Sequence, residues 1–128
     1  MNTITRLSLL LSPLLIVACA ATALPAREFP PGARAPSAAE LGALLRGKTT
    51  STPTPDGIVR AEYAAQAHSL EVYAAGRSDT GTWRVEDGGK ICFELKTFSS
   101  SCGEIRLVGQ DIYMRRASGE VVQVTVLR

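Results

Sequence analysis

Few side chains in this sequence combine the types and the spacing that catalysis requires. His68 is the single histidine, and the residues near it are not of the kinds that bind zinc. Residues 99–101 are consecutive serines in a predicted loop, where serine is common. Glu86 and Asp87 lead into a tight turn, a typical position for Asp. Because these groups do not make a set of nucleophile, base and orienting residue, we predict a protein without enzymatic activity, cofactor or metal.

Cys92 and Cys102 are the cysteines expected to be available for a disulfide in the mature chain, because Cys19 is either acylated or removed with the leader. Both fall on the polar faces of alternating segments, residues 90–95 and 101–107. If these segments pair as a hairpin, the two cysteines face one another on its outer side. An even number of cysteines in an exported chain implies a disulfide. We therefore predict a Cys92–Cys102 bridge that stabilises the fold by about 2 to 3 kcal/mol.

The N-terminus has the composition of a secretory leader. Arg6 precedes an apolar run over residues 7–18 that Pro13 interrupts, and this run is shorter than the ~20 residues of a membrane-spanning helix. Small residues follow the run. The pattern predicts a signal peptide over residues 1–23.

Two cleavage sites compete at the end of this leader. The A-x-A site at residues 21–23 would release a free protein. Residues 16–19, Ile-Val-Ala-Cys, resemble a bacterial lipobox, whose use would remove residues 1–18 and acylate Cys19. Both routes predict export, to the periplasm or as an outer-membrane-anchored lipoprotein of a Gram-negative bacterium. Residues 24–36, rich in Ala and Pro, are then expected to form a disordered tether.

Residues 37–128 are enough for one small domain with a marginal core. The formal charge of +2 falls to +1 when the leader is removed, because Arg6 is its only charged residue. Such a balance gives no reason to expect nucleic acid as a partner. We expect contact with a membrane only through an acyl group on Cys19, and an envelope protein or a small ligand as the partner.

A short helix is predicted at the start of this domain. Ser37 and Glu40 form a capping box, in which each side chain accepts a hydrogen bond from the other's backbone N–H. The leucines within residues 41–45 make an apolar stripe, and Gly47 is a typical C-terminal stop. A helix this short needs to pack its leucines on another element.

From residue 57 onward the apolar residues alternate with polar ones, as in strands. About seven strands are predicted, over residues 58–66, 69–74, 82–86, 90–95, 101–107, 112–116 and 121–127. Short loops favour an antiparallel meander, so the fold class is α+β and mostly β. We favour a curled sheet with the helix packed on one face, because one leucine stripe matches one apolar face. The alternative is a small β-barrel with the helix as a plug.

A few strand residues are candidates for the core or for binding. Trp83 has the parity of the apolar face and is interpreted as the centre of the core. Tyr73 and Tyr113 fall on polar faces and would form a partner-binding surface if their strands are neighbours. Arg115 and Arg116 could bind an anionic head group. Because consecutive strand residues point to opposite faces, we interpret this pair as a solvated strand edge.

The sequence also resembles a known family. The run SAAELGALLRGKT, the segment GTWRVEDGGKICFEL and the following cysteine resemble domain-of-unknown-function family 995, a group of small exported proteobacterial domains. Its members share a helix ending in Leu-x-Gly-x-Thr, a Gly-x-Trp strand, and a turn leading into a Cys-bearing strand. These motifs correspond here to residues 45–49, 81–83 and 87–92, and the resemblance covers about residues 37–102. It implies no activity or catalytic residue, because the family has none established.

Two functional hypotheses follow. The first is an exported, non-enzymatic envelope protein that acts by binding a partner. The alternative is a lipocalin-like barrel that holds a small apolar ligand. An empty apolar cavity beside Trp83 would favour the alternative, and a filled core would exclude it.

Overall fold

The structure is a computed structural model that describes residues 26–128. The predicted leader, both of its cleavage sites and Cys19 lie outside the described residues. The described chain forms one helix and eight strands. In chain order they are α1 (Ala38–Leu45), β1 (Thr49–Thr54), β2 (Gly57–Tyr63), β3 (Ser69–Ala74), β4 (Arg77–Glu86), β5 (Lys90–Leu95), β6 (Ser101–Val108), β7 (Asp111–Arg115) and β8 (Val121–Val126).

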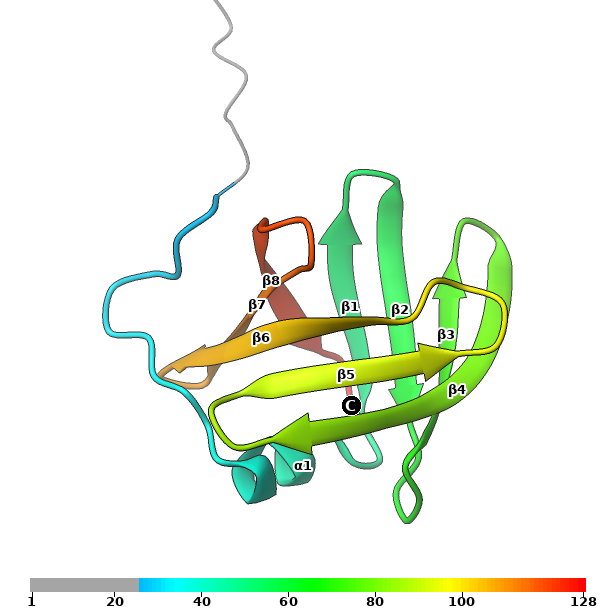
Figure 1. The fold of residues 1–128 in the computed structure, drawn as a ribbon, viewed down its shortest axis with the longest axis horizontal. Coiled ribbons are helices and arrows are strands. Elements are labelled where there is room, and N and C mark those ends of the chain that lie inside the picture. Colours follow the sequence, from blue (N-terminus) through cyan, green and yellow to red (C-terminus); the bar gives the residue numbers. More distant parts are fainter. Residues whose placement is uncertain (1–25) are drawn as a thin grey trace, which may run out of the picture.

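The eight strands form a closed antiparallel barrel. Each strand pairs with the next along the chain, and β8 returns to pair with β1 (Figure 1). At this seam Thr50 lies opposite Val126, and the Thr49 N–H donates to the carbonyl oxygen of Arg128 at 2.9 Å. The Leu127 N–H donates to the carbonyl oxygen of Thr49 at 2.8 Å. The seam removes the last two strand edges, which would otherwise present unpaired backbone groups.

The predicted fold class is confirmed, and its alternative arrangement is the one observed. The chain is mostly β, with one N-terminal helix followed by an antiparallel meander, but the meander closes into a barrel. The favoured curled open sheet is therefore wrong. The strand that the sequence did not predict is β1, whose residues TTSTPT show no apolar alternation. Its inward positions carry Thr50 and Thr52, which are buried, so burial in this strand has no hydrophobic signal.

The helix α1 is held at its N-terminus by two side chains. Ser37 Oγ accepts a hydrogen bond from the Glu40 N–H at 3.1 Å, as the capping box predicts. The Glu40 carboxylate instead pairs with Arg34 in a fork of two bonds, at 2.6 and 3.0 Å. From the turn between β4 and β5, Asp87 Oδ1 accepts a bond from the Ala38 N–H at 2.9 Å. The helix therefore depends on neighbouring segments at its first turn.

In the described part of the chain, no helix is long and apolar enough to span a membrane.

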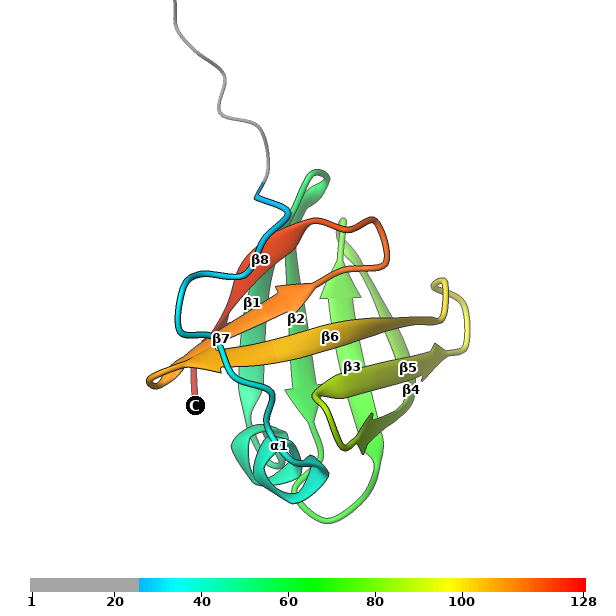
Figure 2. The same cartoon turned by 60° about the vertical axis from the view of Figure 1, so that its left-hand side comes forward.

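The helix closes one end of the barrel (Figure 2). Leu41 and Leu45 are buried in the same cluster as Trp83 of β4. Trp83 is 2 % exposed, and its ring meets that of Tyr63 edge-on with centroids 5.1 Å apart. The interpretation of Trp83 as a core residue is confirmed. Its indole Nε1 is buried and has no hydrogen-bond partner within residues 26–128.

The Ala- and Pro-rich segment before the helix lies against the barrel. The Val121 N–H donates to the carbonyl oxygen of Ala26 at 2.7 Å. Arg34 forms an isolated antiparallel bridge with Leu107 of β6, through backbone bonds of 2.9 and 2.8 Å. The expected disordered tether is therefore wrong for residues 26–36, because backbone bonds to β6 and β8 fix both ends of this segment.

One aromatic side chain also holds the segment in place. The ring of Phe29 lies 4.5 Å from the guanidinium of Arg115 and 5.3 Å from that of Arg106. Arginine cations are attracted to the face of an aromatic ring. The segment therefore gains side-chain contacts that its composition did not indicate.

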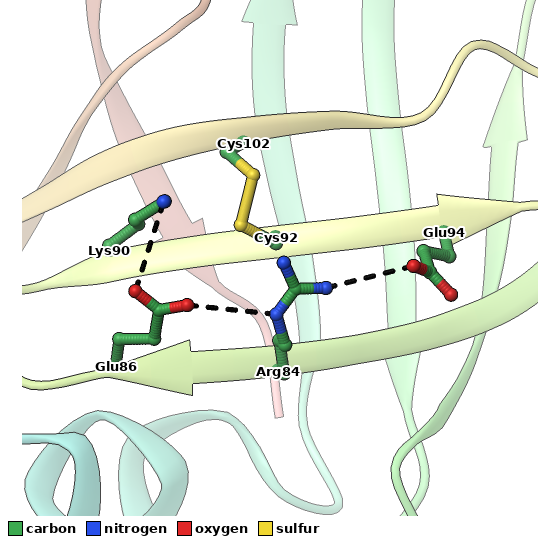
Figure 3. Close-up of a disulfide and its surroundings, with 6 residues drawn as sticks. All are labelled: Arg84, Glu86, Lys90, Cys92, Glu94 and Cys102. Carbon is green, nitrogen blue, oxygen red and sulfur yellow. Dashed lines mark ion pairs between the residues drawn. A yellow bond between two sulfur atoms is a disulfide. The ribbon is translucent and has the colours of Figure 1, made fainter.

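The predicted disulfide is confirmed. Cys92 of β5 and Cys102 of β6 lie directly opposite one another, with Cα atoms 4.0 Å apart. Figure 3 shows the bridge on the outer face of the wall, beside Arg84 and its ion pairs with Glu86 and Glu94. The bridge therefore joins two neighbouring strands from the outside.

Removal of this bridge will lower stability without changing the fold. We expect the double variant Cys92→Ala, Cys102→Ser to lose about 2 to 3 kcal/mol of unfolding free energy, because its unfolded chain is no longer cross-linked. Urea denaturation with and without a reductant measures the loss. Reductant will destabilise the wild type by a similar amount and leave the double variant unchanged. Equal stability of wild type and variant in oxidising buffer would contradict the prediction.

Candidate functional site

The barrel encloses a cavity of about 320 Å³. This volume lies at the lower end of the range of about 300 to 1,000 Å³ found for small-molecule sites. The cavity extends from Leu45 of α1 toward the opposite end of the barrel, which we call the mouth. The mouth is formed by the turns at residues 55–56, 75–76, 96–100 and 116–120.

Every second residue of each strand points into the barrel, and most of these inward positions carry apolar side chains. The apolar members are Leu45, Val59, Ala61, Tyr63, Leu70, Val72, Ala74, Ile91, Phe93, Leu95, Phe98, Ile105, Ile112, Met114 and Val124. Trp83 does not line the cavity, but its ring contacts that of Tyr63, which does. The interior of the barrel is therefore hollow on the mouth side of the Tyr63–Trp83 pair.

One wall of the cavity carries neutral polar groups. Thr50, Thr52 and Thr54 occupy the inward positions of β1 and all line the cavity. Burial raises the pKa of the Tyr63 hydroxyl to about 12, with a smaller opposite effect of Thr50. The phenol is therefore neutral at ordinary pH. This wall can exchange hydrogen bonds with a ligand but places no charge in the inner part of the cavity.

Charge occurs at the mouth. Arg116, which follows β7, lines the cavity together with Ser99 and Ser101. Arg116 Nη1 lies 3.1 Å from Glu120 Oε2, and the two side chains are only 30 % and 20 % exposed. Arg115 lies on the outer wall with Glu104 at 3.1 Å. The solvated-edge interpretation is therefore wrong for Arg116, because closure of the barrel turns its face of the strand toward the cavity.

A buried carboxylate holds the loop that covers part of the mouth. Asp79 of β4 is 7 % exposed. Its Oδ2 accepts hydrogen bonds from the N–H groups of Thr97 and Phe98, both at 2.8 Å, and its Oδ1 accepts one from Thr80 at 2.9 Å. The guanidinium of Arg77 lies over the ring of Phe98 at 5.0 Å. Phe98, which lines the cavity, is thus fixed from both its backbone and its ring.

These backbone bonds also decide the titration of Asp79. The N–H of Phe98 contributes most, and with those of Thr97 and Thr80 it lowers the pKa of the carboxyl, although burial acts in the opposite direction. A carboxylate with a lowered pKa in the folded state adds stability above its unfolded pKa of about 3.9. This contribution is lost as the pH falls through the folded pKa, below that value.

The other candidate residues from the sequence lie on separate parts of the barrel. His68 is exposed in the loop between β2 and β3, with its ring 5.8 Å from that of Trp83. Tyr73 lies on β3 under the guanidinium of Arg60, and Tyr113 lies on β7. Strands β3 and β7 are not neighbours in the barrel, so the structure does not bring the two tyrosines into one patch. Within residues 26–128, no three His, Cys, Asp or Glu side chains are grouped to hold a metal ion.

Sequence reasoning missed the main features of the site. The cavity was expected only under the alternative hypothesis of a ligand-holding barrel, and the threonine wall of β1 and the role of Asp79 were not predicted. Threonine at every second position of TTSTPT was the available signal for an inward-facing strand. Asp79 shares the parity of Trp83, and this was the available signal for a buried acceptor of backbone bonds once the strand is extended to include it.

Replacement of Asp79 will release the loop at the mouth. In Asp79→Asn the amide NH₂ cannot accept the bonds that the carboxylate now accepts, so hydrogen exchange at the Thr97 and Phe98 amides will accelerate. We also expect the variant to lose less stability than the wild type as the pH falls below about 4, because the contribution of the Asp79 carboxylate is absent. Exchange by NMR and denaturation at a series of pH values measure the two effects. Asp56→Asn, in an exposed turn of the mouth, is the control, and unchanged exchange in Asp79→Asn would contradict the assignment.

Comparison with known proteins places the chain in a family. The family model described as "Protein of unknown function (DUF995)" matches residues 13–121. No curated protein and no solved structure matches the chain. The resemblance noted over residues 37–102 is confirmed and extends in both directions. The chain, a closed eight-stranded barrel with an apolar cavity, belongs to the DUF995 family of proteins of unknown function.

Proposed function

We propose that this protein is an exported, non-enzymatic binding protein that holds a small, largely apolar molecule inside its barrel. The observation that carries the proposal is the cavity of about 320 Å³ in a closed barrel, with a predominantly apolar lining. Eight-stranded barrels either fill their interior with side chains or hold one small ligand, as lipocalin-like proteins do. The hollow interior supports the second of these uses.

Small inward-facing side chains leave the space open. Ala61 of β2 and Ala74 of β3 line the cavity, as do the threonines of β1. Larger aliphatic residues at these positions would fill much of the volume. A domain of this size is stabilised chiefly by apolar contacts, so an unfilled interior lowers its stability. A ligand would supply the missing contacts and stabilise the folded state by mass action.

The disulfide supports the exported part of the proposal. Disulfides persist in oxidising compartments and are rare in the cytosol. Cys92 and Cys102 are joined, and their bridge lies on the outer face of the barrel. This is consistent with the leader predicted over residues 1–23.

A substitution that partly fills the cavity will weaken ligand binding while preserving the fold. The neutral fluorophore N-phenyl-1-naphthylamine serves as the probe, and 1-decanol as its competitor. We expect both compounds to bind the wild type. The larger side chain in Ala61→Leu will take up space that ligand carbons would otherwise fill. Because each buried methylene contributes about 0.8 kcal/mol, we expect binding to weaken about ten- to a hundredfold. Ala43→Phe, on the exposed face of α1, is the control and will bind as the wild type does.

Stability gives a second readout of the same variant. If the cavity is empty, the added methyl groups of Ala61→Leu occupy existing space, and the unfolding free energy will stay equal or rise. If the interior is already filled, overpacking will cost about 1 to 3 kcal/mol. A wild type that binds neither probe, together with a destabilised Ala61→Leu, would overturn the proposed function.

Processing in a Gram-negative host tests the exported state. We expect the mature chain in the envelope fraction, with intact mass showing the bridge and cleavage either after residue 23 or before Cys19. Labelling with a radioactive fatty acid, its loss in Cys19→Ser, and accumulation of the precursor under globomycin would identify the lipoprotein route. A label-free mass that begins at Leu24 would identify the free periplasmic route. An uncut chain with two reduced cysteines in the cytosol would contradict export.

A further inference from the structure

We infer that the ligand is a single-chain amphiphile with one anionic head group, whose apolar chain fills the barrel while its head binds Arg116 at the mouth. The simplest member of this class is a fatty acid carboxylate. The inference rests on the proposed function and adds the chemical class of the ligand and its orientation.

The arrangement of charge decides the orientation. Among the residues that line the cavity in the described part of the chain, Arg116 is the only one that is charged at neutral pH. The inner part of the cavity holds aliphatic side chains and neutral hydroxyls. An anionic head buried there would lose its hydration without a compensating cation, which is strongly unfavourable. The head therefore belongs at the mouth and the chain points toward α1.

The geometry of Arg116 leaves room for such a head. The guanidinium is a planar fork with several N–H donors, and carboxylates bind it through two parallel bonds. Its side-chain partner within residues 26–128 is Glu120, through Nη1 at 3.1 Å. The pair is largely buried, with 30 % and 20 % of the side chains exposed. A ligand carboxylate at the mouth would meet a partly desolvated cation whose fork is not saturated by one partner.

Neutral donors continue the site beyond the cation. Ser99 and Ser101 line the cavity and also an adjoining surface depression that Arg116 and Ser118 share. Serine hydroxyls can donate to a carboxylate oxygen that the guanidinium does not reach. The mouth thus has a polar rim around one cation, next to an apolar interior.

The cavity volume limits the length of the chain. A water molecule occupies about 30 Å³ of liquid, so about 320 Å³ accommodates about ten groups of that size. We therefore expect affinity for a saturated carboxylate to rise about fourfold with each added methylene, and to level off near about ten carbons.

The decisive experiment compares an acid with its uncharged analogue. Decanoate and 1-decanol, each below its aggregation limit, are titrated into the full mature chain by displacement of N-phenyl-1-naphthylamine. We expect Arg116→Met to weaken decanoate binding about ten- to a hundredfold and to change 1-decanol binding less than about twofold. Arg116→Lys will recover part of the lost affinity. Arg84→Met, on the outer wall, removes a cation without touching the cavity and will bind both ligands as the wild type does.

Glu120 gives an independent variant with the opposite expected sign. Its carboxylate competes with the ligand for the guanidinium and repels an anionic head. We therefore expect Glu120→Gln to strengthen decanoate binding about threefold to tenfold and to leave 1-decanol unaffected. A role of Glu120 limited to folding would change both ligands equally.

The outcomes distinguish failure of the cavity function from failure of the anionic-head inference. If neither decanoate nor 1-decanol binds the wild type, the proposed cavity function fails. If both bind but Arg116→Met affects them equally while its thermal unfolding matches the wild type, the cavity function stands and the anionic-head inference is overturned. Selective loss of decanoate in Arg116→Met, with selective gain in Glu120→Gln, establishes the inference.

Discussion

The hydrogen-bonded seam between β1 and β8 is the interaction on which the rest of this structure depends. Thr49 forms backbone bonds with both Leu127 and Arg128, so the first strand and the end of the chain are joined directly. Without the seam, the same strands would form a sheet with one solvated face and two open edges. With it, the inner face becomes an enclosed volume, α1 becomes the closure of one end, and every inward side chain faces another across the interior.

Several restraints on this fold lie in the barrel wall and at the mouth, outside the cavity. The disulfide joins β5 and β6 on the outer face, and residues 26–36 bond across β6 and β8. Asp79 fixes the loop at the mouth through the backbone N–H groups of Thr97 and Phe98. Each of these contacts restricts the wall without occupying the cavity. A small domain with an incompletely packed core depends on such restraints more than a filled one does.

The sequence predicted local features well and their closure poorly. Alternation located most strands, and the parity of Cys92 and Cys102 predicted a bridge on the outer face. Alternation assigns side chains to faces but carries no information about curvature, so an open sheet and a barrel share one pattern. The strand β1 was missed because its inward threonines carry no apolar signal. Arg116 shares the parity of Ile112 and Met114, but only closure of the barrel makes that face the lining of a cavity.

The position of the N-terminal segment has a consequence for orientation. Ala26 bonds to Val121 at the start of β8, and Arg27 reaches the carbonyl oxygen of Ser118 in the turn before it. The chain therefore joins the barrel beside the mouth and then passes along the wall toward α1 (Figures 1 and 2). An acyl anchor attached upstream of Ala26 would hold the opening close to the lipid surface and turn the helix-closed end away from it. In that geometry a molecule leaving the bilayer would meet the opening after a short path, with little exposure to water.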